Sequence, residues 1–257
     1  MDGQFARTSA GSCWREPPLS RRVSAHPLLN LKGPSMSFYE QLVAETADSR
    51  DAFLSIPLVR KTLRHGASRS LYLDFLAEAY HHVKHTFPLL ALAASHTSDE
   101  RYQDALVEYM EEERGHEKWI LDDIKVLGGQ PDAVRVGQGG PACRIMVGYA
   151  YYAIEHVSPY AFLGSVHVLE GMSVLLADKV ADAMKASLGL EDDAGFTYLR
   201  THGSLDTKHV GFFRELVDGF DDRRTQRIII DNAIIFYRLY GAIFHDLGAC
   251  AEVSDAA

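Results

Sequence analysis

The chain has 257 residues, of which 47% are hydrophobic and 24% are charged. A chain of this length and composition forms one large globular domain or two small ones. Its formal charge of −9 leaves no basic stripe of the kind that binds a phosphate backbone, so we expect no nucleic-acid partner.

The cysteines and the apolar runs indicate the cellular compartment of the protein. Cys13, Cys143 and Cys250 are scattered, odd in number, and show neither zinc-site nor disulfide-framework spacing. This usage is typical of a reducing compartment, so we expect a cytoplasmic protein. No apolar run approaches the roughly 20 residues of a membrane span, and we expect no membrane partner.

The first 35 residues differ from the rest of the chain. Serine, arginine, glycine and proline occur there without a helical period, and four prolines break any helix. The segment also has no apolar core of the secretory type. We predict that 1–35 is a disordered leader or a non-native extension, either vector-derived or upstream sequence, and that 36–250 is the folded domain.

The folded domain repeats apolar residues with a helical period throughout. No window alternates with period 2 for long enough to demand a strand, and the apolar run at 227–230 is too short to overrule its surroundings. The pattern predicts an all-α, single-domain bundle of seven or eight helices with one long loop at 128–141. The expected helices lie near 37–48, 50–64, 68–95, 98–127, 141–156, 159–188, 193–218 and 222–247.

One helix carries three polar residues on its inward face. His202, Asp206 and His209 are spaced i, i+4 and i+7, which places them on one stripe. Leu199 and Phe213 continue this stripe, so it faces other helices. Burying a carboxylate without a partner costs several kcal/mol, and we interpret the triplet as one wall of a metal site. A hydrogen-bonded core network is the alternative.

The helix expected at 98–127 carries an E-x-x-H pair, Glu113 and His116, on its inward face. One helical turn lets such a pair reach one ion, as in diiron carboxylate bundles. Glu112 competes with Glu113, because the i, i+4 spacing to His116 also works. We favour Glu113, since the stripe of Glu112 is more polar.

Two further helices each present an acid among apolar neighbours. Glu170 is the single acid on the inward stripe of 159–188, and Glu78 holds a similar place on 68–95. For each of them a buried ion pair is the alternative interpretation.

Together these residues form a ligand set without thiolates. Four carboxylates balance the charge of two divalent ions, and three imidazoles complete the set. Such oxygen-rich sites suit non-haem iron or manganese better than structural zinc. We therefore expect two Fe(II) ions, with Mn(II) as the alternative, at Glu78, Glu113, His116, Glu170, His202, Asp206 and His209.

The order E…E-x-x-H…E…H-x-x-x-D-x-x-H resembles the haem-oxygenase-like diiron oxidases and oxygenases. The resemblance runs from about 39 to 247, on Glu78, EEERGHEKW (111–119), VLEG (168–171) and HGSLDTKH (202–209). It implies the bundle shared by haem oxygenase, thiaminase II and pyrroloquinoline-quinone synthase, and a homodimer. It also implies O2 activation at two Fe(II) to oxidise or cleave a small biosynthetic substrate that bears a carboxylate or an amine.

Other functions remain open on the same bundle. A thiaminase-like hydrolase needs a nucleophilic cysteine, for which Cys143 is the candidate. A cofactorless quinone-synthase-like oxidase replaces the acids by basic and hydroxyl groups. Haem oxygenase needs an early histidine, and 36–64 has none. A ferritin-like iron store carries two E-x-x-H motifs, and a partner-binding helical domain needs no site. The candidates for a substrate-pocket lining are Phe87, Tyr151, Tyr152, His156 and Phe162.

Overall fold

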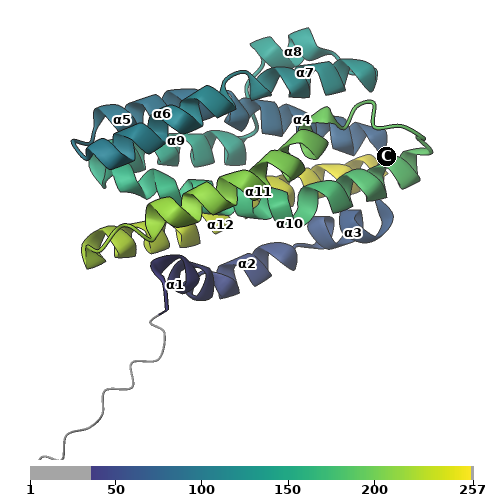
Figure 1. Cartoon of the computed structure of the whole chain (residues 1–257). Helices are drawn as coiled ribbons and strands as arrows, with labels where there is room; N and C mark the ends of the chain where they lie inside the picture. Colours follow the sequence, from purple (N-terminus) through teal and green to yellow (C-terminus); the bar gives the residue numbers. More distant parts are fainter. Residues whose placement is uncertain (1–35, 256–257) are drawn as a thin grey trace, which may run out of the picture. The chain divides into compact units, whose positions relative to one another are not determined.

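The computed structural model describes residues 36–255, without the side chains of 202–208 and 252–255. The predicted leader at 1–35 lies outside the described residues. All regular secondary structure in the described part is helical, and no strand occurs there, as the periodicity predicts (Figure 1). Its elements are α1 (Phe38–Glu45), α2 (Ala47–Leu54), α3 (Pro57–His65), α4 (Arg69–Val83), α5 (Thr86–Ser95), α6 (Glu100–Glu113), α7 (His116–Val126), α8 (Pro131–Val136), α9 (Pro141–His156), the 3₁₀ helix η1 (Pro159–Ala161), α10 (Phe162–Leu188), α11 (Thr197–Val217) and α12 (Arg223–Asp255).

The bundle contains more helices than the predicted seven or eight, because three expected helices are divided. The helix expected at 50–64 is interrupted at Ser55 and Ile56, between α2 and α3 and directly before Pro57. The helix expected at 68–95 breaks at Lys84 and His85, between α4 and α5. Pro88 explains this break, since a proline ring collides with the carbonyl four residues earlier, which is that of Lys84. The loop expected at 128–141 also contains a short helix, α8, which begins at Pro131.

The third break has a different cause. The helix expected at 98–127 is interrupted at Arg114 and Gly115, between α6 and α7. Arg114 is extended, with φ −67° and ψ 108°, and Gly115 has φ +98°. A positive φ favours glycine, because any Cβ is strained there. The break falls between Glu113 and His116, so this pair does not lie on one continuous helix as predicted.

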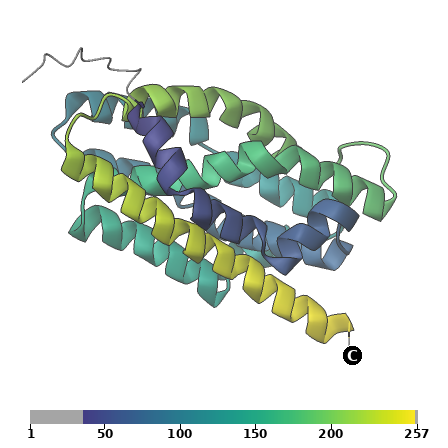
Figure 2. The same cartoon turned by 90° about the horizontal axis from the view of Figure 1, so that it is seen from below.

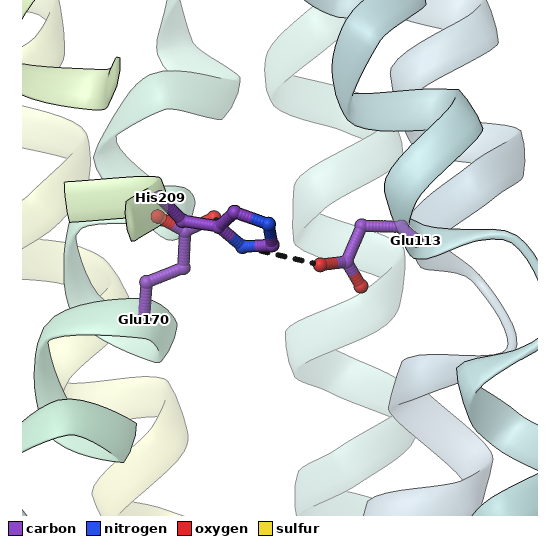
Figure 3. A group of neighbouring side chains, drawn as sticks. All are labelled: Glu113, Glu170 and His209. Atoms are coloured by element: carbon purple, nitrogen blue, oxygen red, sulfur yellow. Dashed lines mark ion pairs between the residues drawn. The ribbon is translucent and has the colours of Figure 1, made fainter. Parts of the chain in front are cut away.

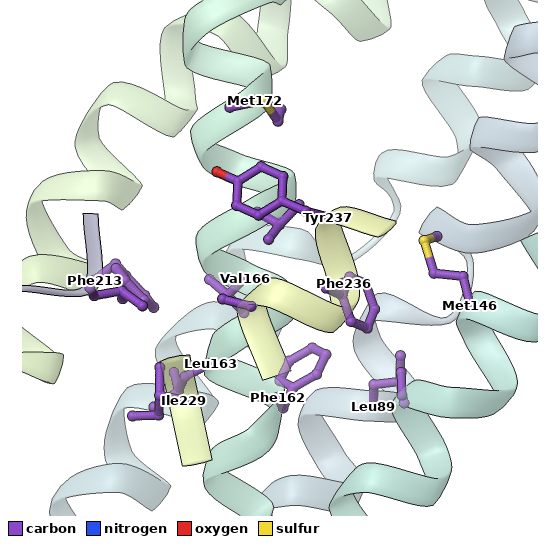
Figure 4. Packing of buried hydrophobic residues seen from close by; sticks show 14 of the residues in the cluster. Leu89, Met146, Phe162, Leu163, Val166, Met172, Phe213, Ile229, Phe236 and Tyr237 are labelled. Atoms are coloured by element: carbon purple, nitrogen blue, oxygen red, sulfur yellow. The ribbon is translucent and has the colours of Figure 1, made fainter. Parts of the chain in front are cut away.

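The longest helices are α10, α11 and α12, and α10 packs against both of the others (Figures 1 and 2). Side chains of α10 such as Phe162 and Val166 pack with Phe236 of α12 and Phe213 of α11 in one buried cluster (Figure 4). A Cβ at Gly164 of α10 would lie 2.6 Å from the backbone nitrogen of Ala233. Glycine therefore lets α10 and α12 approach closely.

Two helical segments, 159–188 and 223–251, are long and apolar enough to cross a membrane by length and composition alone. The apolar window of the first is 50% buried inside the bundle, and that of the second is 44% buried. Core helices of soluble proteins have the same composition, and here both segments supply the buried core.

Candidate metal centre

Three predicted ligands from three different helices meet in the interior of the bundle. Glu113 ends α6, Glu170 lies in the middle of α10, and His209 lies on α11 (Figure 3). One ligand atom of each lies within 4.8 Å of the other two. The sequence alone therefore identified three residues, far apart in the chain, that the fold brings together.

The distances around His209 fit a shared ion. Its Nδ1 lies 3.6 Å from Glu113 Oε1 and 3.8 Å from Glu170 Oε1. Ligand atoms about 2.1 Å from one metal ion lie about 3–4 Å from each other, which matches these separations. His209 is only 1% exposed, and Phe213 and Leu216 of the same stripe are buried too.

The other nitrogen of this imidazole faces a different acid. His209 Nε2 lies 2.7 Å from Glu112 Oε2. A carboxylate in this place favours the proton on Nε2, which leaves the Nδ1 lone pair directed toward Glu113 and Glu170. Both competing acids of the sequence analysis thus contact His209, from opposite edges of its ring.

Glu113 contacts a second histidine through its second oxygen. His116, the first residue of α7, has its Nδ1 3.1 Å from Glu113 Oε2. Its ring stacks on Trp119, with centroids 4.1 Å apart, and is 4% exposed. The two oxygens of Glu113 therefore face two different imidazoles, although the helix is broken between Glu113 and His116.

Glu78, a further predicted carboxylate ligand, does not join the group of Glu113, Glu170 and His209. Both of its carboxylate oxygens accept from the backbone N–H of Gly140, at 2.8 and 3.1 Å. Gly140 is the residue before α9, so Glu78 satisfies an N–H at the start of this helix.

His202 and Asp206 lie on α11, two turns and one turn before His209 respectively. Their side chains lie outside the described residues. Their backbone places them on the same helix face as His209, as predicted.

Tyr109 belongs to the site, although the sequence analysis did not single it out. It lies one turn before Glu113 on α6, and its buried hydroxyl has no hydrogen-bond partner among the described side chains and backbone. Burial raises the pKa of Tyr109 well above 10, and the charges of Glu170, Glu113 and Glu112 add to this. Its i, i+4 spacing to Glu113 was the available signal.

An apolar cavity of about 190 Å³ reaches this centre. Glu113, Glu170 and Tyr109 form part of its wall. Of the aromatic residues predicted to line a pocket, Phe162 does so, whereas the side chains of Tyr152 and Phe87 are exposed at the surface.

Cys143, the candidate nucleophile of a hydrolase, lies beside Glu78 on the buried side of α9. Burial and the neighbouring Glu78 raise the pKa of this thiol to about 12. A thiol with this pKa stays protonated at neutral pH, and the thiolate is the nucleophile in such enzymes. The burial and the raised pKa of this thiol therefore argue against Cys143 as a catalytic nucleophile.

A family of proteins described as iron-containing redox enzymes matches residues 73–241, which is more than half of the chain. The chain belongs to this family. No curated protein is similar to it in sequence.

Solved structures confirm the haem-oxygenase-like fold. A domain of unknown function with a heme oxygenase-like fold from Shewanella denitrificans has a TM-score of 0.77 and 22% identity, over 84% of this chain and 94% of that one. A TenA homolog from Pseudomonas syringae has a TM-score of 0.70 and 11% identity, over 84% and 95%. Heme oxygenase-1 from Synechocystis, in complex with heme, has a TM-score of 0.68 and 13% identity, over 86% and 96%. At these identities the likeness concerns the fold alone.

Proposed function

We propose that the protein is a non-haem diiron enzyme that uses O2 to oxidise a small organic substrate. One observation carries the proposal: the two carboxylate oxygens of Glu113 face different imidazoles, those of His209 and His116. A carboxylate placed in this way could hold two ions at once, as carboxylates in two-metal sites do. Membership in a family of iron-containing redox enzymes supports iron as the metal.

Each residue has a proposed role. Glu113, Glu170 and His209 would hold one ion, and Glu113 together with His116 would hold the other. His202 and Asp206, two turns and one turn before His209 respectively, would complete the set. Glu112 keeps the proton on Nε2 of His209, as a carboxylate behind a metal-binding histidine commonly does. Glu78 is left out of this set, because its carboxylate already binds Gly140.

The donor set fits the proposed cofactor. Glu112, Glu113 and Glu170 all face His209, so negative charge gathers in a region of low dielectric. Divalent cations neutralise this charge, and a set of carboxylates and imidazoles without thiolates suits Fe(II) or Mn(II). Two bound Fe(II) ions supply the electrons that reduce O2.

The protein's own residues position the ions and keep water away from them. Glu113 and Glu170 fix the positions of the ions from two helices that do not adjoin in sequence, which pre-organises the site. The apolar cavity wall keeps bulk water away from the oxidising centre and receives the substrate. The homodimer and the cytoplasmic location remain predictions of the sequence.

Metal analysis tests this proposal. Protein loaded anaerobically with Fe(II) is expected to hold about two irons per chain and to give an O2-dependent absorbance change on mixing with oxygenated buffer. Glu113→Ala is expected to lose both irons, because both ions share this carboxylate, whereas His116→Ala is expected to lose about one. Circular dichroism checks that each variant is folded.

Two results would contradict the proposal. One is a wild-type protein that binds no iron under any loading condition. The other is a folded Glu113→Ala variant that keeps the wild-type iron content.

A further inference from the structure

The cavity that reaches the metal centre is elongated. Its wall follows α10 from Phe162 to Met184. At a rise of about 1.5 Å per residue, these 22 steps extend over about 33 Å. The cavity, of about 190 Å³, is therefore elongated along α10, and we call it the channel.

The channel is apolar along most of its length. Among the described residues that line it, no lysine or arginine is present, and the only carboxylates are Glu113 and Glu170. The other polar side chains are those of tyrosine, serine, threonine and His82. The remaining wall includes Leu58, Leu71, Phe75, Ala177, Val180 and Met184. A charged or strongly polar molecule finds no partner there away from the metal centre.

Glu170 divides the channel into two unequal arms. Eight residues of α10 separate Glu170 from Phe162, and fourteen separate it from Met184. These spacings correspond to about 12 Å and about 21 Å along the helix axis. The longer arm therefore runs from the carboxylates toward Met184.

We propose that this arm holds an unbranched aliphatic chain of the substrate, with its oxidised end beside Glu113 and Glu170. This inference rests on the proposed function, which supplies the oxidising centre, and adds the class of substrate. An elongated apolar channel contacts a flexible chain along its whole length, whereas a compact fused-ring molecule fills only part of it. Burial of each methylene group against the apolar wall contributes the binding free energy.

The absence of lysine and arginine from the described wall has a consequence for the head group. A carboxylate head beside Glu113 and Glu170 is repelled in metal-free protein, because like charges meet there. A neutral alcohol head is not repelled. Metal-free protein therefore allows the channel to be tested separately from the metal centre.

The probes are straight-chain primary alcohols from hexanol to tetradecanol, titrated into metal-free protein by calorimetry. Affinity is expected to rise about fourfold per added methylene, equivalent to about 0.8 kcal/mol, until the arm is full. Cyclododecanol, a ring with as many carbons as dodecanol, is expected to bind at least tenfold more weakly than dodecanol.

Two variants narrow the arm at different depths. Ala177 and Val180 lie seven and ten residues beyond Glu170, about 10 Å and 15 Å along α10. Ala177→Leu is expected to stop the rise in affinity at a shorter alcohol than Val180→Phe does. Val174→Phe is the matched control, because Val174 is on the same helix, lines a different pocket and is 42% exposed.

The outcome is separable from that of the iron experiment. Length-dependent alcohol binding that both lining variants shorten supports the channel, whether or not the protein binds iron. Affinity independent of chain length, or equal binding of cyclododecanol, overturns it. The proposal is also overturned if Ala177→Leu and Val180→Phe keep the wild-type dependence of affinity on alcohol chain length. Circular dichroism checks that both variants are folded.

Discussion

Glu78 holds the first residues of α9 in place through the N–H of Gly140. The first N–H groups of a helix have no partner within the helix, so a carboxylate there contributes both a hydrogen bond and a favourable charge. Its neighbours confirm a tight fit, because a Cβ at Gly140 would lie 3.1 Å from Glu78 Oε1. This contact is structural, and it is independent of Glu113, Glu170 and His209.

Replacement of Glu78 separates the two roles that the sequence left open. Glu78→Ala is expected to lower the free energy of unfolding by about 1–2 kcal/mol, because the N–H of Gly140 loses its acceptor. Urea unfolding measures this loss, and Glu78→Gln, which keeps an acceptor oxygen, is expected to recover most of it. The iron content per chain is expected to stay at the wild-type value. Loss of iron on the scale of Glu113→Ala would instead make Glu78 a ligand.

The sequence could not distinguish Glu78 from Glu113 and Glu170. Each is an acid on an otherwise apolar helix face, and this pattern shows only that the side chain needs a buried partner. Whether the partner is an N–H of a later helix or an imidazole depends on contacts between distant segments. His209 was easier to interpret as a metal ligand, because its helix face already contained two further candidate ligands, His202 and Asp206.

At the scale of whole elements, the break between α6 and α7 positions the E-x-x-H pair. Periodicity predicted one continuous helix through this region, since inward residues continue on both sides of the break. The isolated Gly115 was the only local signal, and glycine is tolerated within helices. Pro88 was a stronger signal for the break between α4 and α5, because its ring collides with the preceding turn. Helix content was therefore predictable, whereas these two divisions were not predicted.

Gly115→Ala tests whether the break needs glycine. Gly115 has φ +98°, and the nearest atom to an added Cβ is Lys118 Nζ at 3.6 Å, so backbone strain is the cost rather than collision. The variant is expected to lose about 1–2 kcal/mol of unfolding free energy in urea. Its iron content is expected to fall as well, because the strain acts between Glu113 and His116.

A matched glycine inside a regular helix gives the control. Gly148 of α9 is exposed, and a Cβ there meets no atom within 4 Å. Gly148→Ala is expected to raise the unfolding free energy by up to about 1 kcal/mol, because alanine favours the helix. If Gly115→Ala were as stable as the wild type and kept its iron, the break would owe nothing to the positive φ.

At the scale of the whole molecule, the fold was the most predictable feature. The apolar stripes of 159–188, 193–218 and 222–247 were read correctly, and these segments became the longest helices, α10, α11 and α12. A period of 3.6 residues persists over many turns, so local errors do not change the result. The long apolar channel was not foreseen, because the aromatic residues proposed for a pocket were chosen without knowledge of which helix faces meet.

His167 of α10 joins several elements at once, and it connects the pH with the stability of the bundle. Its Nε2 lies 3.1 Å from the Thr46 hydroxyl. This hydroxyl donates to the carbonyl of Leu42 at 2.7 Å, so its oxygen accepts the Nε2 proton. The imidazole also packs on Tyr39, Phe213 and Tyr237, which belong to α1, α11 and α12. Burial, and to a lesser extent Arg50, lowers the pKa of His167 to about 4.

The direction of the pH effect follows from this shift. Above pH 6.5 the imidazole is neutral in both the folded and the unfolded chain, so it adds no pH dependence. Between pH 6.5 and about 4 the unfolded chain binds a proton that the folded chain does not, and stability falls as the pH falls. The loss attributable to His167 is at most about 3 kcal/mol, at 1.36 kcal/mol per pKa unit.

His167→Gln removes this titration while keeping a side-chain N–H for the Thr46 hydroxyl. Urea unfolding of both proteins at pH 7 and pH 4.5 isolates the effect, because every other titrating group is common to the pair. The wild type is expected to lose more unfolding free energy on acidification than His167→Gln, although the variant starts less stable at pH 7 through its poorer packing. Equal losses in the two proteins would show that His167 is already protonated in the folded bundle at pH 4.5, and that its burial between α1, α10, α11 and α12 does not exclude the charge.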